Sequence, residues 1–281
     1  ETYPDVVSSL QFERILSASG PCNGKVLRPS NGETPERIAF IQCVGSRDAQ
    51  HEYCSSVCCM YAVKEAIMAM EHESGLECEI FYMDIRAHGK GFDEYVERAK
   101  RMGIKFTRCR PAKVEEQTSG RLLVGYVDED TQRYGEGEFD LLVLSAGLEP
   151  PRDIRELAET FGTELTSTGF ARTMPFDAVA TNRKGVYVCG PFAQPKDIPE
   201  TVVEASGAAA HAMVDLSAVR GTDVTEPVLP PERPIEGEPP RIGVFVCHCG
   251  LNIGGVVDVP SVAEYASRLP HVVFATDSMY T

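Results

Sequence analysis

Four cysteines close together in the first third of the chain are the residues best suited to chemistry. Their spacing is Cys43-x10-Cys54-x3-Cys58-Cys59. Four thiolates suit tetrahedral zinc or an iron–sulfur cube. Structural zinc usually takes separated C-x2-4-C pairs, which adjacent Cys58 and Cys59 match poorly, whereas the corners of a cube lie farther apart. We favour a [4Fe–4S] cluster; zinc, a Cys54–Cys58 or Cys58–Cys59 disulfide, and simple buried thiols remain alternatives.

Four of the six other cysteines have simpler interpretations. Cys78, Cys109 and Cys189 lie in or beside apolar segments, where a thiol acts as a small hydrophobic core residue, and Cys22 is isolated. The given sequence shows no signal-peptide pattern, so we expect a reducing compartment with unpaired thiols and predict the cytoplasm.

The cysteines are positioned by segments that alternate between strand and helix. The apolar segment 37–43 predicts a buried strand, and small and apolar residues at helical spacing predict a helix over 60–73 directly after Cys58 and Cys59. The pattern continues with strands at 79–85, 105–110, 121–127 and 139–144 and a helix at 92–102. The strands 121–127 and 139–144 are expected to flank a turn built on residues 128–130 and 135–137. Such alternation favours an α/β fold with a parallel sheet.

A second region contains a well-marked helix start. Helices are expected at 7–17 and 153–161 and a strand at 185–190. Asp197 can cap a helix, Pro199 suits its first turn, and Glu200 completes a capping box. Alanines and a glycine within this helix would allow close approach to a sheet or a flat ligand. Residues 222–240 are rich in proline and acidic side chains and read as a linker, after which a new strand begins at 241.

Composition excludes several classes of protein. The chain has 281 residues, of which 43% are hydrophobic and 25% charged, so we expect a folded protein. Its formal charge of -15 opposes binding to nucleic acid and to anionic membranes. No apolar run approaches the roughly 20 residues of a membrane span.

Neither glycine-containing turn is a working dinucleotide fingerprint. The segment 42–46 has Cys43 where the first glycine of G-x-G-x-x-G belongs, and the segment 89–94 lacks the third glycine and adds two carboxylates. The chain also lacks a redox C-x-x-C. An NAD(P)H-dependent flavin disulfide reductase is therefore only the second candidate function, after electron transfer through a flavin and an iron–sulfur cluster. A non-catalytic assembly module stabilised by zinc is the third candidate.

Several motifs resemble the A-type subunit of heterodisulfide reductase. They are Gln42-Cys-Val-Gly-Ser-Arg-Asp48, Tyr53-Cys-Ser-Ser-Val-Cys-Cys-Met-Tyr-Ala-Val-Lys64, Met83-Asp-Ile-Arg-Ala-His-Gly-Lys-Gly91, Pro195-Lys-Asp-Ile-Pro-Glu-Thr201 and Gly243-Val-Phe-Val-Cys-His-Cys-Gly-Leu-Asn-Ile-Gly-Gly-Val-Val-Asp258. The resemblance implies a thioredoxin-reductase-like flavoprotein core, incomplete here, that carries FAD and [4Fe–4S] clusters and supports electron transfer, with electron bifurcation at the flavin in methanogens.

The resemblance also assigns residues. It implies that Cys43, Cys54, Cys58 and Cys59 ligate a cluster and that Lys64 lies near the flavin ring. The segment that returns to the FAD domain supplies further cofactor-binding residues, which are Gly190, Pro191, Lys196, Asp197, Ile198 and Thr201. Cys247 and Cys249 are candidates for part of a further cluster site.

The resemblance implies a domain plan and partners. Residues 1–36 end the first part of the FAD domain, 37–147 form a degenerate NAD(P)-type domain with the cysteines, 148–221 return to the FAD domain, 222–240 are the linker, and 241–281 begin a further N-terminal-like domain. We expect a longer polypeptide, and weak FAD binding by this piece alone. Expected partners are B- and C-type subunits and hydrogenase or dehydrogenase subunits, with a homodimer as a further prediction.

Overall fold

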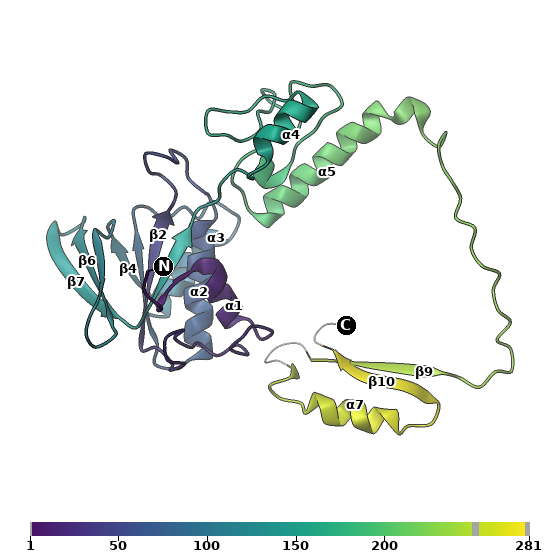
Figure 1. Cartoon of the computed structure of the whole chain (residues 1–281), viewed down its shortest axis with the longest axis horizontal. Coiled ribbons are helices and arrows are strands. Elements are labelled where there is room, and N and C mark those ends of the chain that lie inside the picture. Colours follow the sequence, from purple (N-terminus) through teal and green to yellow (C-terminus); the bar gives the residue numbers. More distant parts are fainter. Residues whose placement is uncertain (1, 249–252, 279–281) are drawn as a thin grey trace. The chain divides into compact units, whose positions relative to one another are not determined.

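The computed structural model describes residues 2–248 and 253–278, which belong to two compact units (Figure 1). The first unit comprises Glu1–Ser9 and Arg28–Asp223, and the second comprises Leu10–Leu27 and Val224–Thr281. The four clustered cysteines all belong to the first unit.

A five-stranded parallel sheet forms the centre of the first unit. Its strands in spatial order are β1 (Val6–Ser8), β8 (Leu141–Ala146), β2 (Arg37–Val44), β3 (Glu77–Tyr82) and β4 (Lys105–Arg108). Both faces of β2 are buried, with Ile38, Ala39 and Phe40 all inaccessible, as expected for a parallel strand covered on both sides. The predicted α/β class with a parallel sheet is confirmed.

Two helices connect the strands on one side of the sheet. Helix α2 (Cys58–His72) joins β2 to β3, and α3 (Phe92–Arg101) joins β3 to β4. The buried positions Ala62, Ala66 and Ala69 let α2 pack closely on the sheet, because they have no side chain beyond Cβ. Both helices confirm the predictions, and α2 begins at the cysteine pair.

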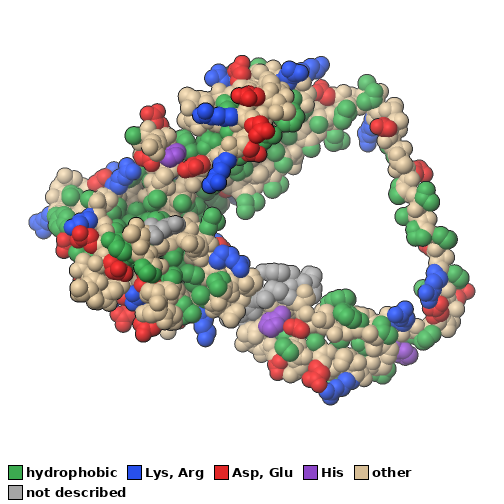
Figure 2. All heavy atoms as spheres, in the orientation of Figure 1, with side chains coloured by type: hydrophobic (Ala, Val, Ile, Leu, Met, Phe, Trp, Pro, Cys, Tyr) green, Lys and Arg blue, Asp and Glu red, His purple; other side chains and the backbone are tan. Residues whose placement is uncertain are grey.

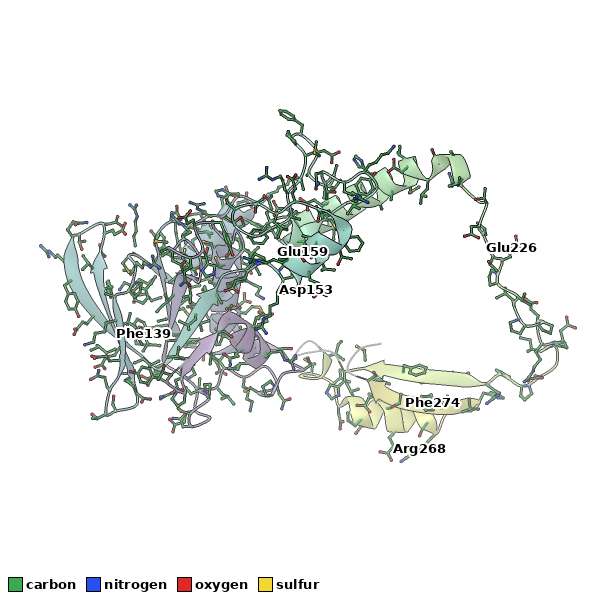
Figure 3. The ribbon with its side chains drawn as sticks, turned by 45° about the horizontal axis from the view of Figure 1, so that its top comes forward. Phe139, Asp153, Glu159, Glu226, Arg268 and Phe274 are labelled. Carbon is green, nitrogen blue, oxygen red and sulfur yellow. The ribbon has the colours of Figure 1, made fainter. Side chains whose placement is uncertain are left out.

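An antiparallel sheet contributes to the core on the other face. Its strands are β5 (Lys113–Glu116), β6 (Leu122–Asp128) and β7 (Arg133–Phe139). The Phe139 ring at the end of β7 (Figure 3) packs edge-to-face on Phe81 of β3, with 5.7 Å between ring centroids. Phe139 and Phe81 thereby join the two sheets.

The predicted turn at 128–130 is confirmed between β6 and β7, but its extension over 135–137 was wrong, because these residues lie in β7. A Cβ at Gly135 would stand 3.0 Å from the Tyr126 ring, and one at Gly137 would stand 2.7 Å from the Phe139 ring. The glycines therefore leave space for neighbouring aromatic rings within a strand. Glycine within a strand can thus mark the close approach of another group, just as glycine elsewhere can mark a turn.

A buried carboxylate joins the edges of the two sheets and makes stability depend on pH. Asp140 accepts hydrogen bonds from the backbone N–H groups of Glu36 and Arg37, each at 2.9 Å, and from Nε of Arg121 at 2.9 Å. Burial alone would raise the pKa of Asp140, but the hydrogen bonds from Arg121 and from the two backbone groups lower it below its ordinary value.

Because the folded-state pKa of Asp140 is lowered, its contribution to stability is present above the unfolded pKa, about 3.9, and is lost as pH falls through the folded value. We expect Asp140→Asn to cost about 1.5–3 kcal/mol at pH 7 and to flatten the fall in unfolding free energy below about pH 4. Urea titrations at several pH values measure both. The control is Asp153→Asn, an exposed residue before α4 without a side-chain cap bond (Figure 3). An equal loss in both variants would contradict the prediction.

The segment after β8 contains short elements and one long helix. These are α4 (Ile154–Phe161), the 3-10 turns η1 (Gly190–Phe192) and η2 (Ser217–Val219), and α5 (Ile198–Asp215). The predicted helix at 153–161 is confirmed. The predicted strand at 185–190 was wrong. Among the described residues, this segment has only an isolated bridge, between Ala180 and Tyr187, and no neighbouring strand that would extend the pairing.

Helix α5 begins as predicted but does not pack as its composition suggested. No residue of α5 is buried, and Ile198, Val203 and Val214 are 80%, 72% and 72% exposed. Hydrophobic side chains are visible along this helix in Figure 2. Its small residues therefore approach no sheet within the part of the chain that the structure describes.

The second unit contains a small strand–helix–strand element. Strands β9 (Ile242–Cys247) and β10 (Val272–Ser278) pair in parallel, joined through α7 (Val259–Ser267). Helix α1 (Ser9–Leu16) starts at the boundary residue Ser9 and confirms the predicted helix at 7–17. Residues 222–240 are exposed and contain no helix or strand. Among the described residues, no helix combines the length and apolar character of a membrane span.

Candidate functional site

The clustered cysteines lie at the edge of the parallel sheet where its strands end. Cys43 is the penultimate residue of β2, and Cys58 and Cys59 open α2. The pairing of β2 with β8 shifts register between Ile41 and Val44, and Cys43 has a positive φ of 60°. An irregular strand end of this kind redirects a side chain, and it is common beside functional sites.

Two buried serines hold the loop between Cys43 and Cys58 in place. The Ser46 hydroxyl donates to the carbonyl of Tyr53 (2.9 Å) and accepts from the N–H of Ser55 (3.1 Å). The Ser55 hydroxyl accepts from the N–H of Leu148 (2.9 Å), just beyond β8. The Tyr53 hydroxyl donates to the carbonyl of Leu148 (3.0 Å). Cys54, between Tyr53 and Ser55, is thereby fixed next to the end of β8.

Gly147, directly after β8, lies against this loop with no room for a side chain. A Cβ there would stand 2.6 Å from Oγ of Ser55 and 2.7 Å from the carbonyl oxygen of Gly45. We expect Gly147→Ala to cost about 1–3 kcal/mol of unfolding free energy, because the backbone of the loop must shift. The control is Gly207→Ala in α5, where the nearest side-chain atom would lie 3.8 Å away. Urea unfolding measures both, and an equal effect in the two variants would contradict the prediction.

The structure brings the four thiols within electrostatic reach of one another. Burial, reinforced by neighbouring thiols, raises the pKa of Cys58 to about 12 and that of Cys59 to about 11. Burial also raises the pKa of Cys43, with a smaller contribution from Cys54. Cys43, Cys58 and Cys59 therefore resist ionisation while no positive charge lies among the thiols.

The cysteines are neither bridged nor arranged around one point. All nine described cysteines are free, so no disulfide joins Cys54 to Cys58 or Cys58 to Cys59. Among the described residues, no three His, Cys, Asp or Glu side chains converge closely enough to hold a single metal ion. Cys247 ends β9 and is half-buried, and Cys249 lies outside the described residues.

Three charged residues border the thiols, and the sequence pattern had assigned them no role. Asp84 and Arg86 follow β3, and Arg47 follows β2. The Cys59 thiol lies 3.8 Å from the carbonyl oxygen of Asp84. In the sequence, these three residues stand out only as members of the motifs 42–48 and 83–91. Their closeness could not be predicted, because β2 and β3, which precede them, pair only in the fold.

The segment predicted to bind flavin is organised around the start of α5. Asp197 caps the helix through the N–H of Glu200 (2.8 Å), and Glu200 bonds back to the N–H of Asp197 (3.1 Å), which confirms the capping box. The Thr201 hydroxyl donates to the carbonyl of Asp197 (2.7 Å), and Ile198 is exposed.

A carboxylate that was not expected from the sequence joins this helix to the preceding turn. Glu204 accepts a hydrogen bond from the N–H of Gly190 (2.8 Å) and pairs with Lys196, whose side chain is 2% exposed. Gly190 has a φ of 67°, and a Cβ there would meet the Thr201 side chain at 2.8 Å. Pro191 lies within η1. Glu204 therefore brings the predicted residues Gly190 and Lys196 together with the first turns of α5.

A cavity of about 310 Å³ connects the two regions. Cys54, Tyr53 and Ser56 line it from the cysteine loop, and the segment 193–195 with Glu200 lines it from the start of α5. The remaining lining residues are Thr166, Thr168 and Phe170. Lys64, half-buried on α2, is not among them. One predicted cluster ligand and the segment flanked by the predicted flavin residues thus share a cavity.

The fold and the site define an α/β domain with a cysteine-lined edge and no complete dinucleotide fingerprint. No family model matches the chain. Among curated proteins it is 43% identical over 235 residues to the A-type subunit of H(2):CoB-CoM heterodisulfide,ferredoxin reductase from Methanothermobacter marburgensis, covering 81% of this chain and 35% of that protein. It is 42% identical to the A-type iron-sulfur subunit of CoB–CoM heterodisulfide reductase from Methanocaldococcus jannaschii, over 76% of this chain and 34% of that protein.

The aligned part of the chain is therefore homologous to the A-type subunit of heterodisulfide reductase, and the resemblance noted in its motifs is confirmed. The chain spans about a third of the length of these relatives. Among solved structures it is similar to the thioredoxin reductase of T. acidophilum, with a TM-score of 0.48, 14% identity, and coverage of 77% of this chain and 58% of that one.

Proposed function

We propose that this chain is the part of a heterodisulfide-reductase-type protein in which FAD and a [4Fe–4S] cluster exchange electrons. The observation that carries the proposal is the group of four neighbouring thiols, one of which, Cys54, lines a cavity shared with the start of α5. The iron-sulfur name of the relative from Methanocaldococcus jannaschii supports the same assignment.

The donor set fits the proposed cluster. Cys43, Cys54, Cys58 and Cys59 would hold it, since four cysteine thiolates are the usual ligands of a [4Fe–4S] cluster. A single zinc ion needs its ligands to point at one atom, which these thiols do not do. In a [4Fe–4S] cluster each thiolate binds a different iron atom, so neighbouring thiols that point to different places suit a cluster better. Burial of Cys58 and Cys59 would exclude water from this side of the cluster.

Within this proposal, the start of α5 would hold the flavin. A bound cluster supplies one-electron transfer and FAD supplies two-electron chemistry. The positive end of the α5 dipole would favour negative charge nearby. Gly190, Pro191, Lys196, Asp197, Ile198 and Thr201 are the proposed contacts, with Lys64 as a further cation from α2. The capping box and Glu204 keep this segment in one conformation.

The raised pKa values of Cys58 and Cys59 do not favour the runner-up, a flavin disulfide reductase. Such an enzyme uses a reactive thiolate, which normally has a lowered pKa. Burial near neighbouring thiols has the opposite effect here. We further propose redox partner subunits of the B and C types, or hydrogenase or dehydrogenase subunits, and a cytoplasmic location; electron bifurcation at the flavin belongs to the same proposal.

Metal analysis of anaerobically purified chain, reconstituted with iron and sulfide, tests the proposed function. About four iron and four acid-labile sulfide per chain are expected for one cube, together with a cluster EPR signal on reduction. Zinc without sulfide would indicate the assembly-module alternative. A chain that stays folded but retains neither metal would overturn the proposal.

A further inference from the structure

Two arginines converge on one carboxylate beside the cysteines. Arg47 pairs with Oδ1 of Asp84, and Nε of Arg86 lies 3.3 Å from the same oxygen. The Nη2 atom of Arg86 lies 3.3 Å from the other carboxylate oxygen, Oδ2. Asp84 thus links Arg47 of the β2 loop to Arg86 of the β3 loop, and the trio of two cations and one anion is net positive.

This charged trio is in contact with three of the four thiols. The Arg47 guanidinium lies close enough to the Cys43 thiol to oppose the rise in its pKa. The Arg86 guanidinium is bonded chiefly to Asp84, and the Cys54 side chain also lies close enough to interact with it. Cys59 lies against the backbone of Asp84 and Arg86.

The backbone holds Arg47 where it is. The N–H of Arg47 donates to the carbonyl of Tyr53 (3.0 Å), within the loop that carries Cys54. Arg47 has a φ of 56°, a left-handed conformation that costs a non-glycine residue energy. Its side chain is 25% exposed, and that of Arg86 37%. Both guanidinium groups are therefore partly removed from solvent, which strengthens their field at the thiols.

We propose that Arg47 and Arg86, held together by Asp84, are positioning residues that raise the reduction potential of the cluster bound by Cys43, Cys54, Cys58 and Cys59. This inference rests on the proposed function. A cluster becomes more negative when it accepts an electron, so fixed positive charge beside its ligands favours the reduced form.

An EPR-monitored redox titration of the reconstituted chain tests this inference. Arg47→Gln and Arg86→Gln are each expected to retain iron and sulfide and to shift the cluster midpoint potential to more negative values, with a larger shift in the double variant. Arg47→Lys and Arg86→Lys keep the charge and are expected to restore most of the potential. The control Arg98→Gln removes an exposed arginine that pairs with Glu71 on α2, and no shift is expected.

Each outcome separates the role of charge from a structural role. Full iron with an unchanged potential in the Gln double variant would overturn the inference. Loss of iron from Gln and Lys variants alike would also overturn it, because the charge would then not be what matters. Loss of iron from the Gln variants, together with full iron and an unchanged potential in the Lys variants, would support the inference. Absence of iron from the unsubstituted chain would instead refute the proposed function.

Discussion

Replacing Cys58 and Cys59 together with serine is expected to abolish iron and sulfide binding while leaving the fold intact. The variant removes two of the four proposed ligands, and a serine hydroxyl is a much poorer iron ligand than a thiolate at neutral pH. Both side chains are buried at the first turn of α2, where serine fits the space of cysteine. We expect retention of less than about a tenth of the iron of the unsubstituted chain, since two ligands alone rarely hold a cluster.

A matched substitution distinguishes ligation from packing. Cys78 is also a buried thiol, in β3, with its sulfur near the carbonyl of Ala66 (3.9 Å). Cys78→Ser buries the same hydroxyl and is expected to cost about 1–3 kcal/mol of stability but to keep the full iron content. Iron and sulfide analysis with far-UV circular dichroism compares the variants. Equal iron loss in both would show that the cluster is lost through unfolding, against the prediction.

Replacing Glu204 with alanine is expected to cost about 3–5 kcal/mol, because it leaves the buried ammonium of Lys196 without its partner. The Lys196 side chain is 2% exposed and that of Glu204 is 14% exposed, so water cannot readily replace the lost carboxylate. The N–H of Gly190 also loses its acceptor. Since no residue of α5 is buried, this contact is a main attachment of the helix to the turn before it.

Urea unfolding followed by circular dichroism measures this loss, and hydrogen exchange at Gly190 reports whether the segment opens locally. The exposed pair of Glu164 and Arg172, 3.7 Å apart with both side chains 60% exposed, provides the control. Glu164→Ala is expected to cost less than about 1 kcal/mol. The double variant Lys196→Met with Glu204→Leu is expected to recover much of the loss, because no charge is then buried unpaired. Equal costs for Glu204→Ala and Glu164→Ala would contradict this account.

Segments next to the sites of these two predictions line one cavity. Cys54 of the cysteine loop and the segment 193–195 before α5 both line it, and Glu204 anchors the latter. The edge-to-face contact of Tyr53 with Phe170, at 5.1 Å between ring centroids, joins the cysteine loop to a third segment that lines the cavity. Loosening the start of α5 is therefore expected to change the surroundings of Cys54 as well.

Local features of this protein could be predicted from the sequence because they depend on neighbours in the chain. The helix start at Asp197 requires only Glu200 three residues later, and the structure contains both reciprocal hydrogen bonds. The buried strand at 37–43 and the helix after Cys58 follow from apolar periodicity. The spacing of the four cysteines likewise indicated a metal site before any geometry was known, although the ligand assignment itself stays a prediction.

Errors arose where the meaning of a residue depends on distant partners. Glycines 135 and 137 look like turn residues, but in β7 they leave room for the rings of Tyr126 and Phe139. The apolar segment 185–190 looks like a strand, but it has only an isolated bridge as a partner. In both cases the local pattern was compatible with two structures, and packing selected one.

The charged residues around the site were decided by tertiary structure alone. Nothing in the spacing of Arg47, Asp84 and Arg86 joins them, because the parallel pairing of β2 with β3 is what places their loops at one edge of the sheet. The sequence by itself determined which side chains could bind metal and where the helices begin. The fold decided which charges those side chains meet, since electrostatic energy depends on distances in space and not on separation along the chain.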